Sequence, residues 1–149
     1  MEEAIAILDS HRTMAISTVR PDEWPQNTIV GYANDGLTLY FLIFRSGQKF
    51  ANIQLNDRIA MAVGQEPRQL GEASAVYAGA HAAEVTNPDQ RKAAWRLLEQ
   101  RHPNLGGFVI PKRSEVAMMK AELKFVSVVD FTKGLGHTEE LSISAGDNT

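Results

Sequence analysis

Apolar and polar residues alternate over several short stretches of the chain, which is the period-two pattern of a β-strand with one buried face. The clearest alternation covers residues 13–19, and residues 26–32 form a second stretch that is rich in β-branched side chains. Further strands are predicted at residues 37–44, 58–63, 74–85 and 123–131. Between the second and third strands, Asp35-Gly36 accepts the positive φ of a tight turn and therefore predicts a hairpin.

Three other stretches predict helices, at residues 2–9, 46–55 and 87–102. Ser46 is the expected N-cap of the second helix, because a serine side chain can accept a hydrogen bond from a first-turn N–H group. The third helix begins with Asn87-Pro88-Asp89-Gln90, in which asparagine can cap, proline suits the first helical position and glutamine completes a capping box. Residues 138–149, which follow a glycine-rich loop, are expected to form a tail.

Strands dominate this pattern, and the helices lie at connections instead of alternating with every strand. We therefore predict an antiparallel sheet that closes into a small barrel. No internal repeat or long linker divides the sequence, so residues 1–149 are expected to form one domain. Residues 40–44 are apolar at every position, which requires cover on both faces of the third strand, either from a barrel core plus helices or from a second subunit.

Composition narrows the possible chemistry. The 149 residues include no cysteine, which excludes a disulfide framework, a thiolate zinc site and a cysteine nucleophile. The net charge of −3 gives no whole-molecule attraction to nucleic acid or to an anionic membrane. The start Met1-Glu2-Glu3 is acidic, unlike a secretory or transit peptide, and no apolar run approaches the ~18 residues of a membrane span, so we expect a cytoplasmic protein.

The histidines are spaced too irregularly for a close pair of metal ligands, so the sequence predicts no metal site. His81 lies on a strand of small residues, where it either faces a pocket or a haem or has an ordinary structural role. No Ser-His-Asp order and no paired carboxylate stands out. The sequence therefore assigns no catalytic residue.

The segment Arg45-Ser46-Gly47-Gln48-Lys49 is the strongest candidate binding site. A helix N-terminus presents unpaired N–H groups and a partial positive charge, so cations are normally disfavoured there. Arg45 and Lys49 nevertheless both lie at this end, with Gly47 between them, and this arrangement is favourable when an anion such as phosphate sits in the middle. The alternative interpretation is that both side chains extend into water.

Several segments follow one another in a recognisable order: Thr13-Met14-Ala15-Ile16-Ser17-Thr18, Trp24-Pro25-Gln26-Asn27-Thr28-Ile29-Val30-Gly31, Asn34-Asp35-Gly36, Leu39-Tyr40-Phe41, Ser46-Gly47-Gln48-Lys49-Phe50-Ala51-Asn52-Ile53 and Asp57-Arg58-Ile59-Ala60. This order resembles the pyridoxamine 5′-phosphate oxidase-like family of FMN-binding split-barrel proteins. The resemblance covers residues 5–133, which is nearly the whole chain.

The resemblance implies a mainly β, six-stranded antiparallel Greek-key split β-barrel with flanking helices, which forms a homodimer with FMN at the subunit interface. In the family, the second strand lines the flavin, and the end of the third strand and the next helix hold its phosphate. The matching positions in this chain are Asn27, Thr28, Ile29 and Val30 for the first group and Ile43, Arg45, Gly47, Gln48 and Lys49 for the second.

This sequence departs from the family at two of these positions. Members often have threonine or serine in place of Ile43 and serine in place of Gly47, so two hydroxyl donors are absent here. The Gly47 N–H group and the two cations remain to bind a phosphate.

The function that the resemblance implies is FMN binding, with flavin-dependent oxidoreductase activity on a small molecule in a cleft at the dimer interface. The alternatives are a non-catalytic flavin carrier or stress-related sensor, and a relative that binds haem or a deazaflavin coenzyme instead of FMN.

Overall fold

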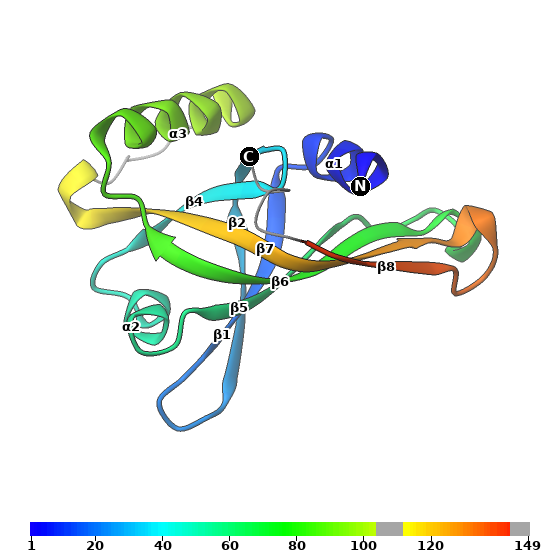
Figure 1. The fold of residues 1–149 in the computed structure, drawn as a ribbon, viewed down its shortest axis with the longest axis horizontal. Helices are drawn as coiled ribbons and strands as arrows, with labels where there is room; N and C mark the ends of the chain where they lie inside the picture. Colours follow the sequence, from blue (N-terminus) through cyan, green and yellow to red (C-terminus); the bar gives the residue numbers. More distant parts are fainter. Residues whose placement is uncertain (104–111, 144–149) are drawn as a thin grey trace.

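One curled antiparallel sheet forms the body of the protein, in a computed structural model that describes residues 1–103 and 112–143. Its strands follow the order β2-β1-β5-β6-β7-β4-β3, and β8 pairs with β7 off this path. Their bounds are β1 (Thr13–Val19), β2 (Pro25–Gly31), β3 (Ala33–Asp35), β4 (Thr38–Phe44), β5 (Arg58–Gly64), β6 (Ser74–Glu84), β7 (Val116–Asp130) and β8 (Thr138–Ser142). The predicted mainly β, antiparallel architecture is thereby confirmed (Figure 1).

The described residues hold eight strands, whereas the resemblance implied six. The two shortest are β3, with three residues, and β8, with five. The expectation that residues 138–149 form a tail is wrong for residues 138–142, because these residues pair with residues 125–129 in the C-terminal half of β7. The last long strand also begins at Val116 and not at residue 123.

The predicted hairpin at Asp35-Gly36 is present, and Gly36 has the positive φ of 60° that the turn requires. It joins β3 to β4, whereas β2 pairs with β1. Tyr32 separates β2 from β3, and these two strands lie at opposite ends of the sheet order. The chain therefore crosses from one edge of the curled sheet to the other at this residue.

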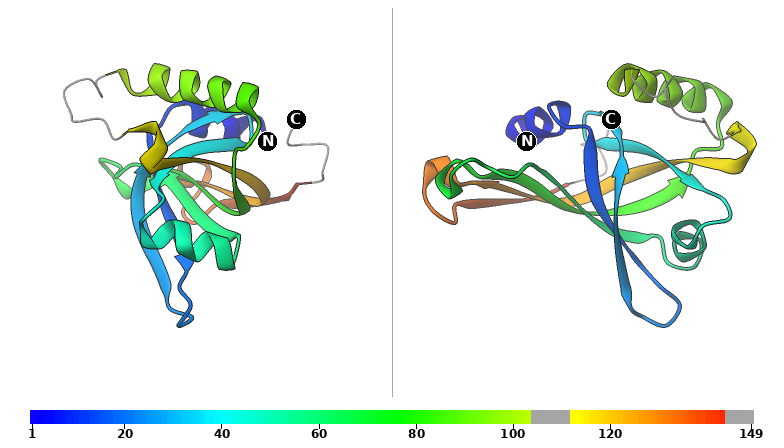
Figure 2. Two further views of the ribbon diagram at one scale, coloured as in Figure 1. Left: turned by 90° about the vertical axis from the view of Figure 1, so that its left-hand side faces the viewer. Right: turned by 180° about the vertical axis from the view of Figure 1, so that it is seen from behind.

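Within the part of the chain that the structure describes, three α-helices cover the sheet: α1 (Glu2–Asp9), α2 (Gln48–Leu55) and α3 (Pro88–Arg101). In the views of Figures 1 and 2, α1 and α3 lie on one side of the sheet and α2 lies on the other. The Asn87 side chain caps α3 as predicted, accepting a hydrogen bond from the Gln90 N–H group at 3.0 Å. The Gln90 side chain does not complete a capping box and donates to the Tyr40 hydroxyl instead, at 3.3 Å.

The prediction that Ser46 caps the second helix is wrong. Gly47 occupies the N-cap position of α2, and no side chain caps this end. The Gly47 N–H group donates to the Phe44 carbonyl at 3.0 Å, which closes a turn directly after β4 and delays the start of the helix to Gln48.

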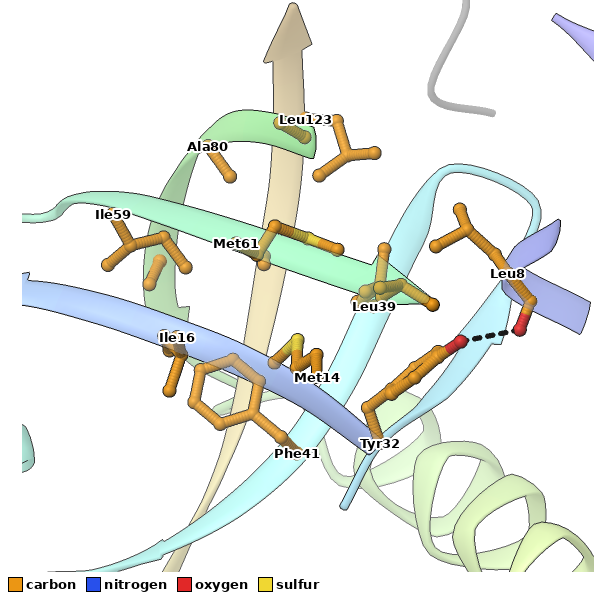
Figure 3. Packing of buried hydrophobic residues seen from close by; sticks show 14 of the residues in the cluster. Leu8, Met14, Ile16, Tyr32, Leu39, Phe41, Ile59, Met61, Ala80 and Leu123 are labelled. Carbon is orange, nitrogen blue, oxygen red and sulfur yellow. Dashed lines mark hydrogen bonds between the residues drawn. The ribbon is translucent and has the colours of Figure 1, made fainter. Parts of the chain in front are cut away.

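The core explains why residues 40–43 are apolar on both faces of the strand. Phe41 and Ile43 are buried in the main core inside the curled sheet, part of which is drawn in Figure 3. Tyr40 belongs to a second cluster, together with Ala94 and Leu98 of α3. A helix of the same chain therefore covers the outer face of β4 at Tyr40 and Leu42, as in one of the two predicted solutions, whereas Phe44 at the end of the strand remains 53% exposed.

A polar cluster joins the end of α3 to α1. The guanidinium of Arg101 donates to the backbone carbonyls of Leu8 and His11 at 3.2 and 3.0 Å, and to the Asn34 side chain at 3.0 Å. The Tyr32 hydroxyl also donates to the Leu8 carbonyl, at 2.6 Å (Figure 3). Burial raises the pKa of Tyr32 to about 12, so this hydroxyl stays a donor. Three segments distant in sequence, residues 8–11, residues 32–34 and the end of α3, are thus tied together at one place.

Candidate cofactor site

The candidate residues gather where α2 meets the sheet. The helix packs against β1 and β4, and edge strand β2 approaches β4 without pairing with it. The Asn52 side chain of α2 bridges the elements, since its amide nitrogen donates to Thr18 of β1 and to Gln26 of β2, both at 3.0 Å. This bridge places the start of α2 and strand β2 in one site.

The four candidate residues on β2 face two directions. Ile29 and Asn27 line hollows on the outer face of the sheet, and Ile29 is 68% exposed. Val30 packs against the main core, and the Thr28 hydroxyl is buried with no hydrogen-bond partner in the described residues. A ligand that contacts side chains of β2 therefore meets alternate residues, because successive residues of a strand point to opposite faces.

The backbone of β2 offers a second kind of contact. Tyr32 donates its N–H group to the Arg12 carbonyl, and this bond shows which residue pairs of the β1–β2 ladder are hydrogen-bonded. Because hydrogen-bonded and non-bonded pairs alternate along an antiparallel ladder, the backbone groups of Asn27 and Ile29 point away from β1. As β2 is an edge strand, these groups lie on the free edge of the sheet.

The start of α2 retains the features of an anion site. Its first-turn N–H groups receive no side-chain cap, and no acidic residue lies in its first turn. A Cβ atom at Gly47 would lie 3.3 Å from the Phe44 carbonyl oxygen, so this tight turn favours glycine over the serine common in the family. The Gly47 N–H group already donates to the Phe44 carbonyl, so an anion at this site would be bound by the N–H groups of the residues that follow Gly47.

Arg45 and Lys49 have different environments. The Arg45 guanidinium forms two hydrogen bonds with the Glu84 carboxylate, at 3.0 and 2.6 Å, and this contact holds the pKa of Glu84 below its usual value. Lys49 as a residue is partly buried, and its ammonium forms no ion pair with the described residues. Unlike Arg45, Lys49 is therefore available to bind an anion at the start of α2.

Two further candidates have mainly structural contacts. Ile43 is buried in the core and has no polar side-chain atom to offer a phosphate. The Gln48 side chain donates from its amide nitrogen to the Asn52 carbonyl oxygen at 2.8 Å. Sequence reasoning did not single out Gln26 or Asn52. The available signal was a polar residue, Asn52, one position from buried Ile53 on a short helix.

Arg45 also lines a hollow of about 430 Å³ between α3 and the segment that precedes β7. The other cations at its wall are Arg91, Lys92 and Arg113, and the Arg113 guanidinium lies 4.5 Å from the centre of the Trp95 ring. These cations come from three separate segments, so no local sequence pattern could have grouped them.

The His81 side chain lies partly in solvent. Its Nδ1 atom lies 3.0 Å from a carboxylate oxygen of Asp57, and its side chain is 43% exposed. No group of three or more histidine or acidic side chains gathers at a possible metal site within residues 1–103 and 112–143. No helix in this part of the chain has the length and apolar character that crossing a membrane requires.

The outer face of β1, β5 and β6 is lined by small side chains, among them Ala15, Ala60 and Ala62. Three large apolar side chains stand on this face and remain exposed to solvent: Ile29 at 68%, Tyr77 at 49% and Phe125 at 57%. Exposed apolar patches of this kind mark interaction surfaces in soluble proteins.

Solved structures of other proteins share this fold. A haem-binding protein from Mycobacterium smegmatis has a TM-score of 0.80 and 17% sequence identity, over 95% of this chain and 57% of that chain, so this chain spans little more than half of its length. General Stress Protein 26 from Bacillus anthracis str. Sterne has a TM-score of 0.73 and 17% identity, over 95% and 97% of the two chains. An F420 reductase has a TM-score of 0.65 and 23% identity, over 82% and 94%.

Among curated proteins, no sequence matches this chain. The family model described as pyridoxamine 5′-phosphate oxidase matches residues 1–128. Because this match covers most of the sequence, the chain belongs to the pyridoxamine 5′-phosphate oxidase family.

Proposed function

We propose that the protein binds FMN, with the phosphate at the start of α2 and the flavin ring along the free edge of β2. The observation that carries this proposal is the uncapped start of α2 next to Lys49, whose ammonium has no ion pair in residues 1–103 and 112–143. Helix N-termini bind phosphate because their free N–H groups and partial positive charge both favour an anion.

The residues of the site fit the parts of this cofactor. Gln48 and Lys49 lie in the first turn of α2, where a phosphate meets the free N–H groups. Arg45 supplies a second cation when it exchanges Glu84 for the phosphate. Gly47 keeps the turn narrow, and Ile43 closes the site from the core side. On β2, the backbone edge of Asn27 and Ile29 and the side chains of Thr28 and Val30 border the ring.

The activity we propose is that of a flavin-dependent oxidoreductase acting on a small molecule. The bound flavin supplies the redox chemistry, and the protein binds and orients both reactants and excludes water. This division of labour agrees with a sequence that offers no catalytic dyad. The cationic hollow lined by Arg91, Lys92 and Arg113 favours a substrate that carries negative charge.

The working unit we propose is a homodimer, joined through the outer face that presents Ile29, Tyr77 and Phe125. Asn27 lines a hollow on the same face, so the edge of β2 borders both the cofactor and the second subunit. Burying three large apolar side chains against small ones in a partner is favourable, at roughly 25 cal/mol per Å² of apolar surface.

Replacing Lys49 with alanine tests the phosphate site. We expect the Lys49→Ala substitution to weaken FMN binding by about 2 kcal/mol, or roughly 30-fold, because a hydrogen bond to a charged group is lost. Fluorescence titration of FMN measures the change. Riboflavin has no phosphate, so its affinity should be unaltered by the substitution.

The matched control is Arg96→Ala, which removes an exposed cation from α3. FMN affinity in this control should equal that of the unmodified protein. Equal FMN affinity in the Lys49 and Arg96 variants would rule out the proposed phosphate site.

A further inference from the structure

The Arg45 side chain stands next to two places for an anion, and a carboxylate already holds one of them. Its guanidinium donates two hydrogen bonds to Glu84, the last residue of β6, at 3.0 and 2.6 Å. The same guanidinium lies 5.8 Å from the centre of the Phe50 ring, and Phe50 belongs to the first turn of α2. Arg45 therefore lies beside the start of α2 while its charge is paired with a residue of another element.

The Glu84 carboxylate contacts Arg45 in the way that a phosphate would. Two parallel N–H···O hydrogen bonds from one guanidinium are the geometry by which arginine binds carboxylates and phosphates alike. Here they come from both terminal nitrogens of Arg45, one to each oxygen of Glu84. Arg45 can therefore offer these two nitrogens to a phosphate only after it has left Glu84.

The pair is ionised at neutral pH and still open to exchange. Hydrogen bonds from Arg45 hold the pKa of Glu84 below its usual value, so the carboxylate carries its charge. The Arg45 side chain is 43% exposed and the Glu84 side chain 22% exposed. Because water reaches the pair, its net contribution to stability is small, and a phosphate with more negative charge than a carboxylate can replace Glu84.

Glu84 still faces a cation after Arg45 has turned away. In addition to Arg45, the positive charge of Arg91 lowers the pKa of Glu84. The Arg91 guanidinium is held next to the end of β6, because it donates to the carbonyls of Val85 and Thr86 at 3.4 and 3.3 Å. The exchange therefore avoids the high cost of leaving a partly buried carboxylate without a counter-ion.

We propose that Glu84 is an internal competitor for Arg45, which must leave this carboxylate before it can bind a phosphate at the start of α2. The inference rests on the proposed FMN binding, and it adds a regulatory residue to that site. Glu84 accordingly weakens the binding of any phosphate-bearing ligand there. It has no effect on a flavin that lacks the phosphate, because Arg45 then stays with Glu84.

Replacing Glu84 with glutamine tests the competition. Glu84→Gln keeps the size of the side chain and removes the charge that holds Arg45. We expect this variant to bind FMN about fivefold more tightly, which corresponds to about 1 kcal/mol of lost competition, and to bind riboflavin as the unmodified protein does. Fluorescence titration measures both affinities. Weaker FMN binding would overturn the inference, because it would show that Glu84 supports Arg45 in binding the phosphate.

Glu115→Gln is the matched control, since it removes the same charge from an exposed position close to Arg45. The Arg45 N–H group donates to the Glu115 carbonyl at 3.0 Å, and the Glu115 side chain forms no ion pair with the described residues. A general effect of reduced negative charge would appear in both variants. Equal FMN affinities in Glu84→Gln and Glu115→Gln would therefore overturn the competition.

Removing Arg45 shows whether Glu84 acts through it. Arg45→Met keeps a long side chain without the guanidinium. In this background, Glu84→Gln should raise FMN affinity no more than Glu115→Gln does, because there is no cation left to compete for. A fivefold gain in the absence of Arg45 would show that Glu84 only repels the phosphate, and the inference would fail.

Urea unfolding of each variant without flavin shows whether the fold is retained. If Glu84→Gln does not fold, Glu84→Asp replaces it, since its shorter carboxylate reaches Arg45 less well and should also tighten FMN binding. If the unmodified protein binds neither flavin, the proposed function fails, and this inference fails with it. If the unmodified protein binds FMN and loses affinity in Lys49→Ala, but neither Glu84 variant binds FMN more tightly, only this inference is overturned.

Discussion

Replacing Ile29 with lysine is expected to separate the protein into monomers. The side chain is 68% exposed on the alanine-lined outer face, so the charge is hydrated in a single subunit and the fold tolerates it. In the proposed dimer the same charge would be buried without a partner. Burying an unpaired polar or charged group costs several kcal/mol, and a cost of about 4 kcal/mol raises the dimer dissociation constant about 1000-fold.

Sedimentation equilibrium measures this change directly. The control is Leu55→Lys, which places the same charge on an exposed apolar position of α2. We expect the control to remain dimeric at concentrations at which the Ile29 variant is a monomer. A dimer as stable in Ile29→Lys as in the control would show that the subunits meet elsewhere, and a monomeric unmodified protein would exclude the interface altogether.

Arg101→Met is expected to cause the largest loss of folding stability among these variants. The substitution keeps an apolar stem and removes the guanidinium that holds Leu8, His11 and Asn34. Two backbone carbonyls and one amide oxygen lose a charged donor in a partly buried place. We expect the free energy of unfolding to fall by about 3 kcal/mol. This is less than three separate charged hydrogen bonds at about 1.5–3 kcal/mol each, because the place is only partly buried and water replaces part of what the freed acceptors lose.

Urea unfolding at one fixed protein concentration measures this loss, because dimer stability depends on concentration. The control Arg96→Met removes an exposed arginine of the same helix and should change the free energy of unfolding by less than about 0.5 kcal/mol. A loss below about 1 kcal/mol in Arg101→Met would contradict the view that this cluster ties α3 to α1.

Much of the fold was predictable because its signals are local. Residues 13–19 alternate in polarity, and β1 has the predicted bounds. The capping residue Asn87 and the proline at the first helical position, Pro88, fixed the start of α3 at the predicted place. The beginning of β7 was missed because residues 116–121 are mostly buried and do not alternate. The strand β8 was missed because its sequence is largely polar and it forms by pairing with the edge of β7.

The candidate site, like the fold, was predictable only where its signals are local in sequence. The segment from Arg45 to Lys49 was recognisable because a helix start, a glycine and two cations are adjacent in sequence. The pairing of Arg45 with Glu84 and of Asn52 with Gln26 joins residues 39 and 26 positions apart, and no local pattern reports such contacts. The cover of β4 by α3 is also a tertiary property, and it accounts for an apolar strand that sequence alone could equally assign to a dimer interface.

The central claim of this account is that the protein binds FMN in the site formed by α2 and β2. Equilibrium dialysis of the purified protein against FMN, followed by its absorption spectrum, tests this claim most directly. We predict one flavin bound per chain, a two-band flavin spectrum and displacement of the bound FMN by excess riboflavin. A colourless protein that takes up no FMN, or a protein whose spectrum shows a haem Soret band in place of the flavin bands, would contradict the account.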